Sequence, residues 1–260
     1  MDGGLIALDF ERLLWAVGLM AVAIGLSIWQ RLDLGWSLAI ATLRTIVQLL
    51  AVGYFLAIVF AWRSPFAVLA VILGMMTIAS VVARNRISKK LTQLLPLIWA
   101  SLLVSTALTL TYTSLLVIRP DTWYEPRYVI PLAGIILGNA MNAAAIAGDR
   151  LFSTLQNSRV EIETHLSLGA TPTQAIVLYR REAIKAGLIP TLNSMMVVGI
   201  VTLPGIITGQ LLSGVDPLNA ALYQMLIMFI LAFSTLLTAI LVTYGLSQRC
   251  FSQAAQLVLP

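Results

Sequence analysis

Few side chains in this sequence could do covalent or metal chemistry. The 260 residues include one cysteine, Cys250, and one histidine, His165. Neither a disulfide within the chain nor a cage of several Cys and His ligands can therefore form. The sequence also lacks a GxxxxGK[ST] loop, which would hold the phosphates of ATP. We therefore expect no enzymatic activity in this chain and no cofactor of its own.

The remaining candidates are polar groups inside long apolar runs. Arg44 is the one ionisable residue in such a run, and Gln48 lies one helical turn further along. Such residues are functional candidates by default, although Arg44 could instead extend to the membrane surface. Asn139, Met141 and Asn142 offer amide and thioether ligands that could hold a cation weakly. The alternative is that the amides bond neighbouring helices together.

A Pro-Gly pair interrupts another apolar run, and we expect a kinked or broken helix there. Pro204 removes a helix hydrogen bond and clashes with the preceding turn. Broken helices often form transport sites, although a purely structural kink is the alternative. The candidate translocation residues are Arg44, Gln48, Asn139, Met141, Asn142, Thr202, Pro204, Gly205 and Gln210.

Membrane spans must position these residues. The chain is 59% hydrophobic and 10% charged, whereas about a quarter of the residues in soluble domains are charged. Its apolar runs of about 20 residues match the thickness of a bilayer. The sequence predicts an all-α, polytopic membrane protein with about seven spans, in one permease domain over residues 1–260. The predicted spans are Leu13–Trp29, Trp36–Phe60, Pro65–Ala83, Leu94–Ile118, Tyr128–Gly148, Ala186–Leu212 and Asn219–Gly245.

Basic residues predict the orientation of these spans. The link Arg84–Gln93, which includes Lys89 and Lys90, and the segment Asp149–Lys185 are rich in Lys and Arg, so both should be cytoplasmic. The N-terminus, which includes Asp2 and Asp9, should then lie outside and the C-terminus inside. Because the basic residues lie between spans, the net charge of +5 does not indicate binding to nucleic acid. We expect the chain in the inner (plasma) membrane.

The cytoplasmic segment 149–185, between spans five and six, has the signals of two helices around a turn. Ser158 and Glu161 have the spacing of a capping box, and Gly169 can end the first helix in the left-handed conformation. Thr171 as N-cap, with Pro172 and Gln174 after it, predicts that a second helix begins there.

The surface of this segment carries both charge signs. Its candidate contact residues are Glu161, Glu163, Arg180, Arg181 and Glu182. A helix lying on lipid headgroups, which is the alternative, would be rich in Lys and Arg. Mixed charges suit a protein partner better. Leu155, Ile162 and Leu166 lie near one stripe and are available for burial.

Several runs in the chain resemble known permeases. ETHLSLGATPTQAI, from Glu163, resembles the EAA loop of ATP-binding-cassette permeases, in which Glu163 and Gly169 match and Thr164 and His165 replace small residues. RTIVQL, GIILGNAM and LPGIITGQLL are similar to runs of the FetB-type permeases, bacterial exporters of iron and other metals. Plant half-size permeases tied to aluminium tolerance are similar too.

The resemblance implies a function for each part of the chain. Residues 149–185 would dock into a separate ATPase subunit, which would hold the ATP and Mg, and two copies of this chain would work together. The transported solute would be iron or another metal ion, or alternatively a non-metal solute such as a nucleotide sugar. Ile206 and Ile207 stand where the family has a Met-Met pair, so the metal ligands stay unknown.

Two other classes of function compete with transport. A membrane-embedded enzyme would need paired acids, a nucleophile or a metal cage, and the predicted spans contain no Asp, Glu, Cys or His. A membrane scaffold without transport activity would need neither a kinked sixth span nor a coupling segment. These two features therefore favour a transporter.

Overall fold

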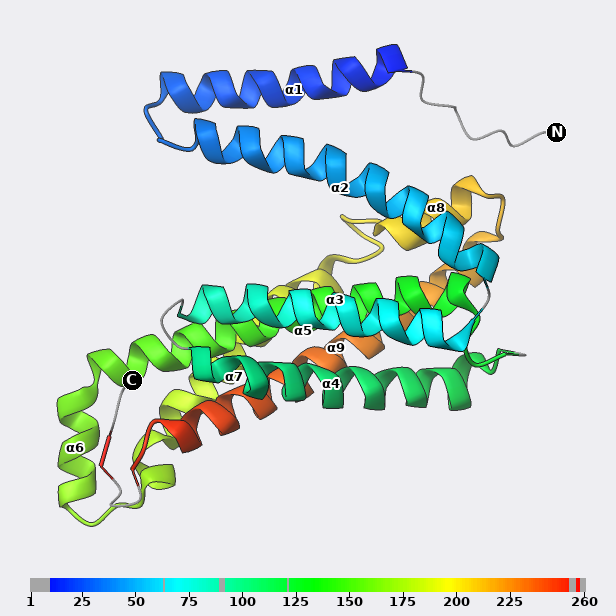
Figure 1. Ribbon diagram of the computed structural model, residues 1–260. Helices are drawn as coiled ribbons and strands as arrows, with labels where there is room; N and C mark the ends of the chain where they lie inside the picture. The colour runs from blue at the N-terminus through cyan, green and yellow to red at the C-terminus, as the bar shows by residue number, and fades with distance from the viewer. Residues whose placement is uncertain (1–9, 63, 89–91, 121, 253–255, 258–260) are drawn as a thin grey trace.

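The computed structural model describes residues 10–62, 64–88, 92–120, 122–252 and 256–257, and these are mostly helical (Figure 1). The helices are α1 Phe10–Trp29, α2 Gly35–Trp62, α3 Pro65–Ile87, α4 Leu95–Tyr112, α5 Pro126–Asn157, α6 Arg159–Ser167, α7 Pro172–Val197, α8 Gly205–Leu212 and α9 Pro217–Arg249. A 3-10 turn, Thr92–Leu94, precedes α4, and a π-helical turn, Thr113–Ile118, continues it. The all-α prediction is confirmed.

Six of the described helices are long and apolar enough to cross a bilayer, namely α1, α2, α3, α5, α9 and the combined stretch Leu95–Ile118 of α4 and the π-helical turn. The polytopic character of the chain is therefore confirmed. The predicted sixth span, Ala186–Leu212, is not among these six, because it is broken, as the Pro-Gly pair indicates: α7 ends at Val197 and α8 begins at Gly205. Of the residues that predict orientation, Asp2, Asp9, Lys89 and Lys90 lie outside the described part of the chain.

The break between α7 and α8 starts earlier than the Pro-Gly pair. Pro204 is the N-cap of α8, as its effect on a helix predicts. The helical path is already lost at Gly199, whose φ of +80° lies in the left-handed region. The Gly199 amide donates to the Thr202 carbonyl at 2.9 Å, which closes a tight turn. In Figure 1, α7, this turn and α8 together lead from the end near α6 to the opposite end of the bundle.

The core surrounds α5, which packs against α3, α4, α7 and α9. Its fully buried side chains include Ile136, Leu151 and Leu155. Small residues bring α7 close to it: a Cβ atom at Gly187 would lie 3.0 Å from the Ala143 carbonyl oxygen and 3.0 Å from the Ala147 Cβ. Close backbone approach at small residues is typical of helix packing in membranes.

A buried hydroxyl pair joins α4 to α9. The Thr238 hydroxyl donates to the Ser105 hydroxyl oxygen at 2.6 Å, and both residues are fully buried. Hydrogen bonds of this kind across membrane helices contribute about 1 kcal/mol each. The pair fixes how these two helices are rotated against each other.

The helices α1 and α2 form a hairpin that diverges from the bundle (Figure 1). Only 6% of the apolar stretch in each is buried within the chain, against 50% in α5 and α9. The contact with the bundle is at the C-terminal end of α2, where Val59 packs into a cluster with Val68, Ile72 and Ile130. Most of the hairpin surface is thus left for lipid or for another chain.

Candidate functional site: the coupling segment and the intramembrane polar residues

The first helix of the predicted coupling segment is α6, which lies across one end of the bundle (Figure 1). Leu155 at the end of α5 and Ile162 on α6 are fully buried, and Leu166 packs partly against the same core. The predicted apolar stripe is therefore confirmed. It anchors α6 to the transmembrane bundle, so a force applied to α6 reaches the core directly.

Gly169 ends α6 as the sequence predicts. Its φ is +91°, and the hydrogen bonds are those of a Schellman motif. The Gly169 amide donates to the Leu166 carbonyl at 3.0 Å, and the Ala170 amide donates to the His165 carbonyl at 3.0 Å. The turn between the two helices therefore has a fixed geometry.

The second helix starts with the predicted capping box. The Thr171 hydroxyl accepts from the Gln174 amide at 3.3 Å, and the Gln174 side-chain oxygen accepts from the Thr171 amide at 2.8 Å. Pro172 occupies the first turn, where its missing amide hydrogen is not needed. The helix α7 then continues without interruption into the bundle.

The predicted capping box at Ser158 is wrong, although α6 does begin after that residue. The Ser158 side chain makes no capping hydrogen bond, because its φ of −99° and ψ of 22° are not the extended values that a capping residue needs. The helix α6 follows α5 almost directly, and the Ser158 amide still donates to the Thr154 carbonyl at 2.9 Å. The Ser158 hydroxyl group and the Glu161 carboxylate instead interact with the Tyr179 side chain on α7.

Tyr179 joins α6 to α7. Partial burial raises the pKa of its phenol, and a hydrogen bond to the Glu161 carboxylate raises it further, while a hydrogen bond with Ser158 lowers it. One residue later, the Arg180 guanidinium lies over the Tyr244 ring on α9, 6.0 Å from the centroid, within the range of cation–π attraction. Two of the predicted contact residues, Glu161 and Arg180, thus bind neighbouring helices.

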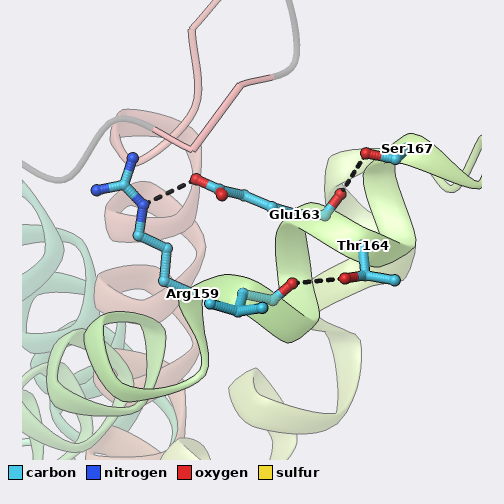
Figure 2. A network of polar contacts seen from close by, with 5 residues as sticks. Arg159, Glu163, Thr164 and Ser167 are labelled. Atoms are coloured by element: carbon cyan, nitrogen blue, oxygen red, sulfur yellow. Dashed lines mark hydrogen bonds and ion pairs between the residues drawn. The ribbon is translucent and has the colours of Figure 1, made fainter.

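The outward surface of α6 combines an ion pair with apolar side chains. The Arg159 Nε lies 2.8 Å from the Glu163 carboxylate (Figure 2). The hydroxyl groups of Thr164 and Ser167 bond to carbonyls of the same helix. Val160 is 78% exposed.

Leu168 at the end of α6 is 81% exposed, and Arg181 and Glu182 on α7 are also exposed. The pair of Arg159 with Glu163 was not predicted from the sequence, although a spacing of four residues is the signal for such a pair. Exposed apolar side chains beside a charged pair are suited to contact with a protein.

The intramembrane candidates do not form one cluster within the described part of a single chain. Arg44 and Gln48 are exposed on α2, a helix of which only 6% of the apolar stretch is buried within the chain. Asn139 donates to the Ile135 carbonyl of its own helix at 2.9 Å. Asn142 is exposed and accepts from the Arg86 guanidinium at 3.1 Å, a contact that sequence analysis did not predict.

The remaining candidates lie on α5 and around the α7–α8 break. Met141 is partly buried against the main core. Thr202 and Gly205 are exposed, and Pro204 is partly buried between them. The Gln210 side-chain oxygen on α8 is buried and has no hydrogen-bond partner in the ranges that the structure describes. No three His, Cys, Asp or Glu side chains of those ranges lie together.

Comparison with known proteins gives a consistent picture. Residues 10–251 match the model of the "Uncharacterised protein family (UPF0014)". The "UPF0014 membrane protein slr1647" of Synechocystis sp. (strain ATCC 27184 / PCC 6803 / Kazusa) is 52% identical over 99% of this chain and 100% of its own. The "Probable iron export permease protein FetB" of Escherichia coli (strain K12) is 33% identical over 95% of this chain and 94% of its own.

A plant protein is similar too. The "Protein ALUMINUM SENSITIVE 3" of Arabidopsis thaliana is 30% identical over 93% of this chain and 87% of its own. The resemblance that the sequence motifs indicate is therefore confirmed. No solved structure matches the chain.

Proposed function

The chain belongs to the uncharacterised protein family UPF0014, and we propose that it is the membrane-spanning permease subunit of an ATP-binding-cassette transporter. A separate ATPase subunit hydrolyses ATP, and the transported solute is iron or another metal ion moving out of the cell. Similarity to the probable iron export permease protein of Escherichia coli supports iron as the transported solute. The protein resides in the inner (plasma) membrane.

The observation that carries the proposal is the geometry of α6, its turn and α7. A Schellman motif, a capping box and a buried apolar stripe all hold α6 rigidly on the bundle. Its outward surface, with Glu163, Val160 and Leu168, is exposed. A rigid helix with an exposed surface of mixed character can receive force from a soluble partner. A membrane scaffold would have no use for it.

We propose seven crossings with the N-terminus outside. Six are continuous helices, and the broken pair of α7 and α8 makes the seventh, which agrees with the start of α1 and the end of α9 lying at opposite ends of the molecule in Figure 1. Unpaired backbone groups at membrane depth are tolerated only against protein or a water-lined cavity. The break near Pro204 therefore lies on the translocation pathway in this proposal.

A second copy of the chain completes the pathway. Arg44 and Gln48 are exposed on α2, and a charge facing hydrocarbon at that depth costs about 3 kcal/mol or more. These side chains therefore face water or another chain. Two copies would give two coupling segments for the paired ATPase subunits and would line a polar pathway between α2, α5 and the α7–α8 break.

The test is coupled transport by the purified permease and its ATPase in liposomes. We expect ATP-dependent movement of iron, and Glu163→Arg should reduce it at least tenfold because the reversed charge repels the basic groups of the ATPase subunit that the Glu163 carboxylate is proposed to contact. Glu125→Arg is a matched control on the predicted opposite face of the membrane, since Glu125 makes no capping hydrogen bond. Normal ATPase binding and normal transport in Glu163→Arg would overturn the proposed coupling.

A further inference from the structure

A cavity of about 700 Å³ opens at the turn between α1 and α2. It is lined by polar side chains, Ser27, Arg31 and Asp33, and by apolar ones that include Ile24, Ile28 and Trp36. The volume lies within the range of small-molecule sites. The cavity is separate from the coupling segment and from the α7–α8 break, so its role is independent of the proposed transport function.

The ends of two membrane spans place this cavity at a bilayer surface. Both α1 and α2 are apolar enough to cross the membrane, so the turn from Gln30 to Leu34 lies at the level of the lipid headgroups whichever way the chain is oriented. Trp29 and Trp36 flank the turn and are 76% and 78% exposed. Tryptophan is enriched at this level because its ring is apolar and its N–H is polar.

The two charges in the cavity do not neutralise each other. Arg31 and Asp33 both line it, yet no ion pair within 4.0 Å joins these two side chains. Both backbones are left-handed, with φ of 51° and 53°, and non-glycine residues in that conformation gather at ligand-binding sites. An unpaired cation and an unpaired anion in one cavity are complementary to a zwitterion.

Ser27 adds a third polar group to the lining. It is only 4% exposed, and its hydroxyl oxygen finds no hydrogen-bond partner in the part of the chain that the structure describes. A buried hydroxyl without a partner is costly, and a bound molecule with an oxygen atom could satisfy it. Ile24 and Ile28 provide an apolar wall beside it.

We propose that this cavity binds the headgroup of phosphatidylethanolamine. The Arg31 guanidinium pairs with the lipid phosphate, as arginine commonly does with phosphate oxygens, and the Asp33 carboxylate accepts from the lipid ammonium group. Ser27 donates to an oxygen of the lipid, and the acyl chains follow the apolar wall. An anionic lipid such as phosphatidylglycerol lacks the ammonium group and places its charge near Asp33.

The test is retention of lipid by the full-length protein, measured by native mass spectrometry after exchange into detergent with equal phosphatidylethanolamine and phosphatidylglycerol. We expect the wild type to retain phosphatidylethanolamine at least fivefold over phosphatidylglycerol. Arg31→Gln should lose both lipids, whereas Asp33→Asn should keep phosphate binding and lose the preference between them. Equal retention of the two lipids by the wild type would overturn the proposal.

Two controls keep the test specific. Arg119→Gln removes another arginine with a left-handed backbone, φ 47°, which does not line this cavity, so it should leave retention unchanged. A loss as large as that of Arg31→Gln would mean general lipid attraction and would contradict the site. Competition by millimolar inorganic phosphate would show a site for free anions, which also contradicts a lipid site. Elution volume and thermal stability confirm that each variant is folded.

Discussion

The Glu163 side chain forms an ion pair within its own helix, α6. Its carboxylate pairs with Arg159 at 2.8 Å (Figure 2), and exposed pairs of this kind contribute about 0.3–0.5 kcal/mol. Such a weak pair can open when a stronger partner is offered. The pair therefore orients Glu163 without preventing the contact that we propose with an ATPase subunit.

The left-handed backbone at Gly169 predicts an order among substitutions. Asparagine tolerates φ of +91° better than a β-branched residue does. Gly169→Val should therefore destabilise the turn by about 1–2 kcal/mol, and Gly169→Asn by less. We expect ATP-driven transport to fall more in Gly169→Val than in Gly169→Asn, while both variants elute as the wild type does. The opposite order would contradict a coupling role that depends on this turn.

Cys250 should be almost unreactive in the folded protein. Burial raises the pKa of its thiol to about 11 from an ordinary value near 9, and the side chain is fully buried. The thiolate fraction at neutral pH thus falls about a hundredfold. A maleimide reagent at pH 7.5 should label Cys250 only after denaturation. Rapid labelling of the native protein would show that the C-terminal end of α9 is open.

Three helices are linked by side chains at the coupling segment. The Glu161 and Ser158 side chains interact with the Tyr179 phenol on α7, and the Arg180 guanidinium lies over the Tyr244 ring on α9. A movement of α6 is therefore passed to α7 and α9 through polar contacts as well as through the apolar stripe. The helix α7 leads directly to the broken region between Val197 and Gly205.

Removing the Tyr179 hydroxyl group tests this link. Tyr179→Phe keeps the ring and deletes the hydrogen bonds to α6, at a cost of about 1 kcal/mol. We expect fewer solute molecules moved per ATP hydrolysed, with ATPase binding unchanged. Tyr124→Phe, on the predicted outer face, is the matched control and should leave this ratio unchanged. An unaltered ratio in Tyr179→Phe would mean that the apolar contacts alone carry the movement.

The close contact between α5 and α7 predicts that a larger side chain at Gly187 lowers the thermal stability of the bundle. A side chain at Gly187 would meet the Ala143 carbonyl at 3.0 Å, so Gly187→Val should destabilise the bundle by about 1–3 kcal/mol. Gly138→Ala is the control, because a Cβ atom there would meet nothing within 4 Å. Thermal unfolding in detergent should show a lower midpoint only for Gly187→Val. Equal midpoints would mean that the two helices can separate freely.

The α1–α2 hairpin makes few contacts with the rest of the described chain. Its polar residues Arg44 and Gln48 are exposed, and few of its apolar residues are buried. A second copy would cover part of this surface, whereas lipid alone would leave the arginine unsatisfied.

The mass of the purified complex tests this assembly. We expect two copies of this chain with two ATPase subunits, because the paired motors need two coupling segments. Native mass spectrometry of the complex in mild detergent gives the ratio directly. A complex of one chain with one ATPase subunit that is stable and hydrolyses ATP at the full rate would contradict the dimer.

Features that depend on neighbours along the chain could be predicted from the sequence. The apolar runs determined the spans, and the Gly169 and Thr171 signals determined the turn of the coupling segment, because these hydrogen bonds join residues within five positions. The tertiary structure alone decided which distant side chains meet, such as Tyr179 with Glu161 and Arg86 with Asn142. In the structure the break also starts earlier than predicted, at Gly199, and Ser158 does not cap α6. In both places packing between helices outweighs local signals worth about 1 kcal/mol.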